Sequence, residues 1–410
     1  MLLGAVEGVT RLLWTLSIAQ FLAMQVWFNF SAVMPVVERE WGLSSTQSGI
    51  IVAFFHIGYV AAVFFYSFLS DRYNPKYSFM YGALIAGVSG IFFSILAQGF
   101  WSALLLRFIS GVGIAGIYVP GMKIVAQTSS DRARGAALGL FVGSLVVGSG
   151  FSLLVSGLFI NLVGWKGVIF ITSCSAILAA SLIYFSKIPE NIRIHNQRLN
   201  MALLKRVLTR RNLLVNISYT GHCWELYAMW AWIGPFMVYY FQTHSVANAI
   251  SVGNFIGAFV VMIGGVASFI GGRMSDSFGR LKSIKLFIYI SIACSLSIGW
   301  LTPASMWILL PVVFVYGFTI IADSPIYNTM ITEISDPEIT GIALGIQSVL
   351  GFSATIFSPM IFGILLDYFN WGIAFTTIGV MTIITPICIS MLRKKLSVEI
   401  DANIRNTDIL

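Results

Sequence analysis

Apolar stretches of about 20 residues or more recur along this chain of 410 residues, and they constrain its fold more than any other feature. A helix of that length crosses the roughly 30 Å hydrocarbon core of a bilayer. Hydrophobic residues make up 58% of the chain, charged residues only 10%, and the mean hydropathy is +0.88. Because about a quarter of the residues in an average soluble domain are charged, the composition predicts an all-α integral membrane protein.

The apolar stretches divide into twelve expected transmembrane helices. The first is too long for the core of a signal peptide and lacks a small-residue cleavage site, so we expect it to be retained. The expected helices cover residues 12–36, 47–70, 77–98, 101–125, 135–160, 167–187, 212–240, 250–271, 284–302, 305–331, 341–366 and 372–392.

The distribution of basic residues predicts how these helices are oriented. If the N-terminus lies in the cytoplasm, 20 of the 24 Lys and Arg residues fall in cytoplasmic segments. We therefore expect both termini in the cytoplasm of a protein in the inner or plasma membrane. The net charge of +8 then reflects topology and contact with anionic lipid, which makes nucleic acid a poor partner.

Short motifs repeat at an offset of about 205 residues, which indicates an internal duplication. Ala23-Met24-x-x-Trp27 recurs as Ala228-Met229-x-x-Trp232, and Pro120 matches Pro325. Two six-helix halves, 1–187 and 212–410, are predicted to be joined by a basic cytoplasmic loop, 188–211. Such halves are related by a pseudo-twofold axis and enclose a central cavity near the midplane. Further matches in the same order are Ile57-Gly58 with Ile263-Gly264, Gly135 with Gly341, Gly157 with Gly363, and Trp165 with Trp371.

The charged turns of the chain resemble signatures of the major facilitator superfamily. Gly272-x-x-x-Asp276-x-x-Gly279-Arg280-x-Lys282 is similar to the family's loop between its second and third helices, here in the second copy. Arg107-x-x-x-Gly111-x-Gly113 resembles the signature of the fourth helix, and Asp131-Arg132-x-Arg134-Gly135 the stretch before the fifth. Within the superfamily, Tyr118-x-Pro120-Gly121-Met122-Lys123 and His222-Cys223-Trp224-Glu225-Leu226 look most like the cyanate and nitrate permease branches. The resemblance implies secondary active transport by alternating access.

Ionisable residues inside the expected helices are candidates for function, because each costs at least about 2.5 kcal/mol at the centre of a bilayer. Arg107 can bind an oxyanion with two parallel hydrogen bonds, or it can bond to the first helix or a neighbouring acid and hold the bundle together. On a continuous helix Arg107, Gly111, Ile114 and Tyr118 would share one face and form a cavity wall. The full set is His56, Arg107, Lys123, His222, Glu225 and Asp323.

Two acids are candidates for proton coupling. His222 and Glu225 are three residues apart and therefore neighbours on one helix face, as a proton site or as a polar pair that packs the two halves. Asp323 occupies the repeat position of Tyr118, so we expect the two to face each other, with Tyr327 one turn further on. Asp323 is the stronger candidate of the two acids.

The remaining polar and aromatic candidates have a packing interpretation beside the functional one. His56 stands near the point where nitrate permeases carry an arginine, and its repeat mate is Met262, which argues against a nitrate porter. Lys123 is interpreted as a lysine that extends to the inner interface. Gln25, Asn29 and Gln347 either contact solute or bond between helices. Trp27 and its repeat mate Trp232 are candidate cavity walls.

The repeated charged turn is expected to act as a conformational latch that does not touch solute. An acid near a helix N-terminus is favoured by the helix dipole, and basic neighbours can tie it to the next helix. The expected latch residues are Asp71, Arg72, Gly272, Asp276, Gly279 and Arg280.

These features predict a transporter that couples the uptake of a small anion to protons. The alternatives are a proton-driven exporter of amphipathic compounds and a sensor that does not transport. No nucleotide loop, metal cluster or nucleophile triad is present in the sequence, and its four cysteines lack CxxC spacing, so we expect no enzyme activity, cofactor or metal. We expect a monomer.

Overall fold

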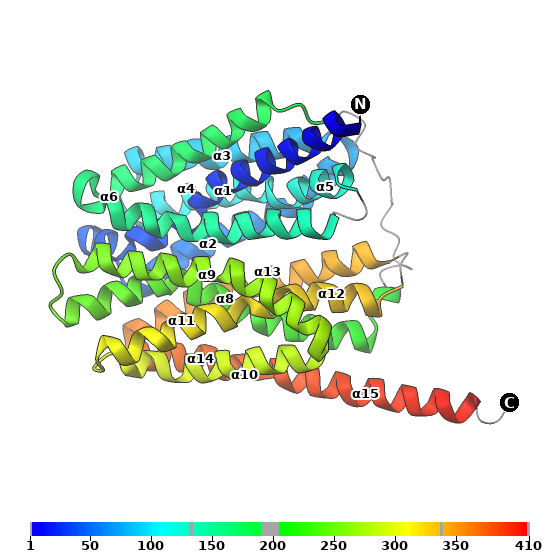
Figure 1. The fold of residues 1–410 in the computed structure, drawn as a ribbon. Helices are drawn as coiled ribbons and strands as arrows, with labels where there is room; N and C mark the ends of the chain where they lie inside the picture. Colours follow the sequence, from blue (N-terminus) through cyan, green and yellow to red (C-terminus); the bar gives the residue numbers. More distant parts are fainter. Residues whose placement is uncertain (1, 131–133, 190–204, 337–338, 408–410) are drawn as a thin grey trace.

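The computed structural model describes residues 2–130, 134–189, 205–336 and 339–407, which form two bundles of helices side by side (Figure 1). The described residues contain no strand, so the predicted all-α fold is confirmed. The first bundle holds α1 (Leu2–Trp41), α2 (Ser45–Arg72), α3 (Pro75–Leu96), α4 (Phe100–Ala115), α5 (Tyr118–Thr128) and α6 (Arg134–Phe185). The second holds α8 (Arg210–Thr243), α9 (Ala249–Phe278), α10 (Arg280–Ile298), the short 3₁₀ helix η1 (Gly299–Leu301), α11 (Met306–Ala322), α12 (Ser324–Ile334), α13 (Thr340–Tyr368), α14 (Trp371–Thr382) and α15 (Ile384–Thr407).

The helices account for the predicted twelve passes. Ten spans within the described residues are long and apolar enough to cross a membrane. One of them, α6, is 52 residues long and turns at Gly164, where φ is 67° and ψ is 179°, so it makes two passes. The more polar α8, with 34 residues, makes one further pass inside the second bundle. Most of the predicted linker, residues 190–204, lies outside the described residues.

Residues that favour helix starts stand where the sequence changes from turn to apolar run. Ser44 precedes α2 and forms a capping box with Gln47, in which each side chain bonds to the other residue's backbone. Asn74 caps α3, and Pro75 is its first residue, where a missing N–H costs nothing. The observed starts of α2 and α3 therefore lie two residues from the predicted starts at 47 and 77. The agreement is poorer where no such signal stands: α1 begins ten residues before its predicted start, and α9 and α15 end seven and fifteen residues after their predicted ends.

Two passes that the sequence predicts as continuous helices are broken at equivalent positions. The pass made by α4 and α5 breaks at Gly116 and Ile117, and the pass made by α11 and α12 breaks at Asp323. Pro120 and Pro325 follow the breaks, and proline cannot donate the backbone bond that would continue the helix. The repeated proline therefore places a break near the middle of the same pass in each half.

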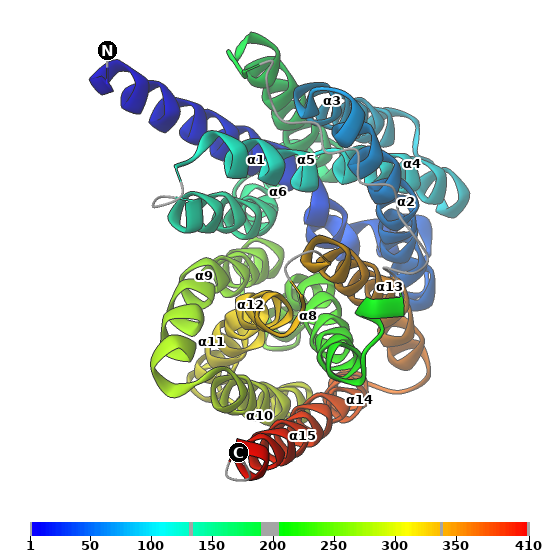
Figure 2. The same cartoon turned by 90° about the vertical axis from the view of Figure 1, so that its right-hand side faces the viewer.

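The beginning of α1 and the end of α15 lie at one end of the molecule, which Figure 2 shows facing the viewer. We call this the terminal end, and we call the opposite end, with the loop between α1 and α2, the far end. An even number of passes requires this arrangement. The side of the membrane that the terminal end faces remains the prediction made from the Lys and Arg distribution.

Candidate functional site

Arg107 lies deep in the first bundle and is 3% exposed. Its guanidinium donates to the backbone carbonyls of Val26 and Trp27 at 3.0 and 2.9 Å, and to Oδ1 of Asn29 at 2.9 Å. The same group lies over the ring of Phe55, with its Cζ 4.4 Å from the ring centroid. These contacts fit the interpretation in which Arg107 holds α1, but Nε has no partner among the described residues.

The predicted cavity wall along α4 is interrupted. The helix ends at Ala115, and Tyr118 begins the separate helix α5, within electrostatic reach of Tyr59. Gly111 packs against α2, since a Cβ atom added there would lie 1.9 Å from the backbone oxygen of Phe55. The small residue therefore allows two helix backbones to approach closely. Tyr118 lies parallel to the ring of Phe141, with 6.5 Å between the ring centroids.

An aromatic cluster joins the two halves beside Arg107. We call it the central aromatic cluster: Trp27, Phe55, His56, Tyr59, Tyr227 and Phe352. The ring of Tyr227, from α8, lies 5.6 Å from His56 and 6.1 Å from Trp27, as measured between centroids. His56 Nδ1 lies 3.0 Å from the carbonyl of Val52, whereas its Nε2 has no partner among the described residues.

His222 and Asp323 form a buried pair in the second half, with exposures of 1% and 0%. Nδ1 of His222 lies 2.9 Å from Oδ1 of Asp323, at an angle outside hydrogen-bond geometry. The imidazole therefore faces Asp323, and the predicted pairing of His222 with Glu225 is wrong. Asp323 lies at the break between α11 and α12, which brings its side chain toward α8.

Tyrosine side chains surround this pair. Tyr327 lies 5.5 Å from His222 between ring centroids, and its hydroxyl accepts a 3.1 Å bond from Ser218. Tyr219 stacks on His222 at 5.8 Å. The hydroxyl of Tyr118 is close enough to those of Tyr219 and Tyr227 for an electrostatic interaction. Tyrosines thus connect the His222–Asp323 pair to the central aromatic cluster.

Glu225 is 0% exposed and belongs to a different group of side chains. Its carboxylate lies beside the hydroxyls of Ser291 and Tyr316, from α10 and α11. The carboxylate and the two hydroxyls are close enough to interact, but none of their oxygens makes a hydrogen bond of regular geometry within the described residues.

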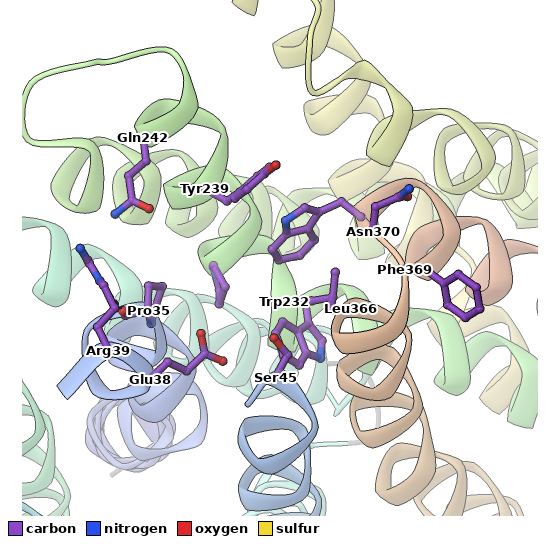
Figure 3. A pocket seen from close by; sticks show the side chains of 12 residues that line it. Pro35, Glu38, Arg39, Ser45, Trp232, Tyr239, Gln242, Leu366, Phe369 and Asn370 are labelled. Carbon is purple, nitrogen blue, oxygen red and sulfur yellow. Dashed lines mark hydrogen bonds between the residues drawn. The ribbon is translucent and has the colours of Figure 1, made fainter. Parts of the chain in front are cut away.

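The repeat predicted that Trp232 and Trp27 form the walls of one cavity. In the structure they do not lie together. Trp232 stacks on Phe362 at 5.1 Å between ring centroids, and its Nε1 donates to the carbonyl of Pro359 at 3.0 Å. A pocket of about 370 Å³ lies next to it at the far end (Figure 3). Glu38 and Arg39 from α1 stand on one side of this pocket and Trp232 on the other, and Trp371 also belongs to its lining.

The other polar predictions resolve into contacts between helices. Asn29 accepts from Arg107 and donates to Thr172 at 3.0 Å, and Gln25 is buried nearby in α1. Nε2 of Gln347 lies 3.4 Å from the carbonyl of Tyr327. Lys123, which was interpreted as extending to the interface, instead donates to the carbonyl of Ser70 in the last turn of α2.

Residues of the predicted latch form ion pairs in the second half. Arg280 forms an ion pair with Asp276 and a second one, at 2.9 Å, with Glu333 of α12. Gly279 adopts φ 87°, which favours glycine, and a Cβ atom added to Gly272 would lie 4.0 Å from the ring of Pro325. In the first half Arg72 lies 4.1 Å from the ring centroid of Phe68, and the side chain of Asp71 lies outside the described residues.

The first half uses a different cation at its turn between α2 and α3. Lys76 donates to the carbonyls of Tyr184 and Ser186, at 2.9 and 2.7 Å, at the end of α6. A cation at a helix C-terminus interacts favourably with the helix dipole. Each turn is thus tied to another helix of its own half, but by different chemistry.

The hydrogen bonds found between the two halves, among the described residues, gather toward the far end. Asp367 at the end of α13 accepts from the backbone N–H groups of Ser45 and Thr46, both at 2.8 Å. Asn161 of α6 donates to Ser251 Oγ of α9 at 3.0 Å. Asn254 of α9 donates to the carbonyl of Ala32 at 2.9 Å and to Ser156 Oγ at 3.2 Å.

Near the terminal end the same helices have room around them. A Cβ atom added to Gly139 of α6 or Gly345 of α13 would meet no atom within 4 Å. These two glycines are repeat mates, 206 positions apart. The structure is therefore joined at the far end and less tightly packed at these two positions near the terminal end.

Several residues at the site were not among the predicted ones. Tyr219 and Tyr227 flank His222 on α8, and Tyr59 follows His56 by three residues, but aromatic residues are too common in this chain to stand out. The pairs at the far end do leave a signal. Ser45 and Ser251 are 206 positions apart, and so are Asn161 and Asp367, the same offset as the other repeat matches.

Comparisons with known proteins agree with the architecture. A family model described as Major Facilitator Superfamily matches residues 16–359. The D-xylose–proton symporter, a solved structure, superimposes with a TM-score of 0.76 at 16% identity, over 93% of this chain and 97% of that one. At that identity the likeness shows the fold alone.

Two relatives illustrate the level of sequence similarity. The uncharacterised MFS-type transporter YybF of Bacillus subtilis is 27% identical over 282 residues, which cover 64% of this chain and 66% of YybF. A probable hexose phosphate transport protein of Chlamydia trachomatis is 27% identical over 155 residues, 37% of this chain and 33% of that protein. This chain therefore matches slightly less than two thirds of the first protein and a third of the second.

Proposed function

The chain belongs to the major facilitator superfamily of membrane transporters, and from this premise we propose that it takes up a small anion together with protons. As a multi-pass protein of the cell membrane it would work by alternating access, with the two halves rocking about a site between them. The observation that carries the proposal is the buried charge of Arg107, which has no carboxylate partner among the described residues.

The remaining donors of Arg107 fit an oxyanion. A guanidinium has five N–H donors, and three of them are used by α1. Nε–H and one N–H of Nη2 remain, and donors on neighbouring nitrogens can bind two oxygens of a carboxylate or phosphate at once. The unpartnered Nε2 of His56 offers a further polar contact in the same cluster. The partial match to a hexose phosphate transport protein also favours an anion.

The His222–Asp323 pair supports coupling to protons. Either member of a carboxylate–imidazole pair 2.9 Å apart can take up or release a proton, and both are shielded from solvent. Because Asp323 stands at a helix break, a change in its protonation can be coupled to movement of α12 against α11. The tyrosines between this pair and Arg107 support a link between the two proposed functions.

Uptake into proteoliposomes tests the proposal, with hexose phosphates, inorganic phosphate and nitrate as probes. With the outside acidic, wild-type protein should accumulate one of these anions, and a protonophore should abolish the accumulation. Asp323→Asn should lose accumulation driven by the pH gradient but retain exchange of labelled for unlabelled anion. Arg107→Lys should raise KM roughly tenfold, because lysine keeps the charge but not the fork of donors.

Three outcomes would contradict the proposal. Unchanged accumulation by Asp323→Asn would remove the acid from coupling, and an unchanged KM in Arg107→Lys would remove the arginine from the site. If none of the anions accumulated and apolar cations were transported instead, the result would favour the alternative of an exporter of amphipathic compounds. The aromatic side chains around His56 are the observation in favour of that alternative.

A further inference from the structure

The Glu225 cluster lies inside the second bundle, and neither the proposed anion site nor the proton pair uses it. Its three members come from α8, α10 and α11, which all belong to this bundle. Glu225 and Ser291 have an exposure of 0%, and so does Tyr316. A carboxylate buried without a partner is costly, so its retention here requires a compensating charge or proton.

The hydroxyl groups beside Glu225 lack the regular hydrogen bond that most buried hydroxyls of the described residues make. Helical serines commonly donate to a carbonyl: on the same helix Ser295 donates to Phe375 at 2.8 Å, and Ser297 donates to Ala293 at 2.9 Å. Ser291 makes no regular hydrogen bond to any described residue and lies beside the carboxylate of Glu225 instead. The hydroxyl of Tyr316 is likewise unpartnered, whereas the hydroxyl of Tyr240 donates to Ala304 at 2.7 Å. The free lone pairs thus gather around one carboxylate.

We propose that Glu225, Ser291 and Tyr316 form a binding site for a monovalent cation, with Na⁺ as its ligand. The site offers four oxygen atoms: two from the carboxylate and two from hydroxyls. Oxygen ligands suit hard cations, and one carboxylate neutralises one positive charge. A divalent ion would leave a net charge in the bundle, and the described residues contain no group of three or more His, Cys, Asp or Glu that could hold a metal ion.

A bound cation at this site would stabilise the second bundle. Glu225 also interacts electrostatically with Asp323. The charge of a cation bound at Glu225 would therefore affect the protonation of the proposed His222–Asp323 pair. Na⁺ would therefore support transport as a second ion without touching the anion.

Thermal unfolding of the full-length protein in detergent, followed by tryptophan fluorescence, tests for the site. At constant pH and ionic strength, replacement of choline by Na⁺ should raise Tm in a saturable way, while K⁺ should have a smaller effect. Glu225→Gln should abolish the Na⁺ response. Ser291→Ala and Tyr316→Phe remove one oxygen each. Each should raise the Na⁺ concentration that gives half of the Tm shift roughly tenfold.

Two control variants separate this site from others. Ser283→Ala removes another buried, unpartnered serine on α10 and should leave the Na⁺ response unchanged. Asp323→Asn removes the other buried acid and should also keep it, so that failure of proton coupling and failure of Na⁺ binding are distinguishable. Equal responses to Na⁺, K⁺ and choline would overturn the proposal. A Tm that depends on pH through Glu225 but not on Na⁺ would overturn it as well, by showing that the carboxyl binds a proton.

Discussion

At the far end, duplicated sequence has placed two contacts between the halves at equivalent positions, in addition to the bonds of Asn254. In one contact, Asp367 of α13 caps the start of α2 at Ser45 and Thr46. In the other, Asn161 of α6 bonds to Ser251 near the start of α9. The glycines behind them also correspond: Gly363 packs on the carbonyl of Ser45, and Gly157 packs on that of Ser251.

The two contacts share geometry but differ in strength. A carboxylate that accepts two backbone N–H groups at a helix N-terminus is charge-assisted and is favoured by the helix dipole. A single bond from an amide to a serine hydroxyl is neutral and weaker. Gly363 also fits more tightly, since an added Cβ would lie 2.2 Å from the oxygen of Ser45, against 3.0 Å for Gly157 and Ser251. The α2–α13 contact is therefore the stronger of these two equivalent contacts.

The largest effect is expected from Gly363→Ala. Its methyl group would collide with a backbone oxygen that cannot move alone, at a cost of about 1–3 kcal/mol to the closed far end. We expect a cysteine placed at the buried Ser48, in a variant without the four native cysteines, to react about tenfold faster with an impermeant maleimide. Gly157→Ala is the matched control and should change the rate less than threefold. Equal rates for the two variants would contradict the unequal packing.

A smaller effect is expected from Asp367→Ala. Loss of two charge-assisted bonds at a partly solvated helix end should cost the closed far end about 1–2 kcal/mol. Asn161→Ala should cost about 0.5–1 kcal/mol, because it removes one neutral hydrogen bond. The distance between spin labels at the far ends of α2 and α13 measures the shift toward opening. If Asn161→Ala opened the far end more than Asp367→Ala, the proposed order of strength would be reversed.

The smallest effect is expected from Asn161→Asp, which makes the weaker contact resemble the stronger one. A carboxylate near the N-terminus of α9 should stabilise closure by about 0.3–1 kcal/mol, and salt should screen the gain. Maleimide labelling at position 48 should slow about two- to fivefold at low salt. The difference should shrink at 1 M salt. Faster labelling at low salt would show that the carboxylate repels the neighbouring backbone, against this expectation.

Much of the fold could be predicted because membrane helices follow from length and apolarity alone. The duplication also identified residues that occupy equivalent places in the two halves. Among them, Pro120 and Pro325 follow the two helix breaks. The breaks themselves were not predicted, because a proline can either kink a helix or end it, and the packing decides which.

The site was predicted less well, because helix spacing relates residues only within one helix. His222 and Glu225 are neighbours by spacing, but Asp323 reaches His222 from another pass. Trp27 and Trp232 match in the repeat, yet one lies in the central aromatic cluster and the other at the far end. Arg107 was identified as buried and charged, but its use of α1 as a partner was only one of two options.

The sequence by itself determined that this chain spans the membrane twelve times in two related halves, since hydrophobic length and internal repetition act through local chemistry. It also determined which ionisable groups must lie within the bilayer core. Only the tertiary structure decided their partners, because partners come from helices that are distant in sequence and brought together by packing. It placed Arg107 against α1, joined His222 to Asp323, and left Glu225 among unpartnered hydroxyls.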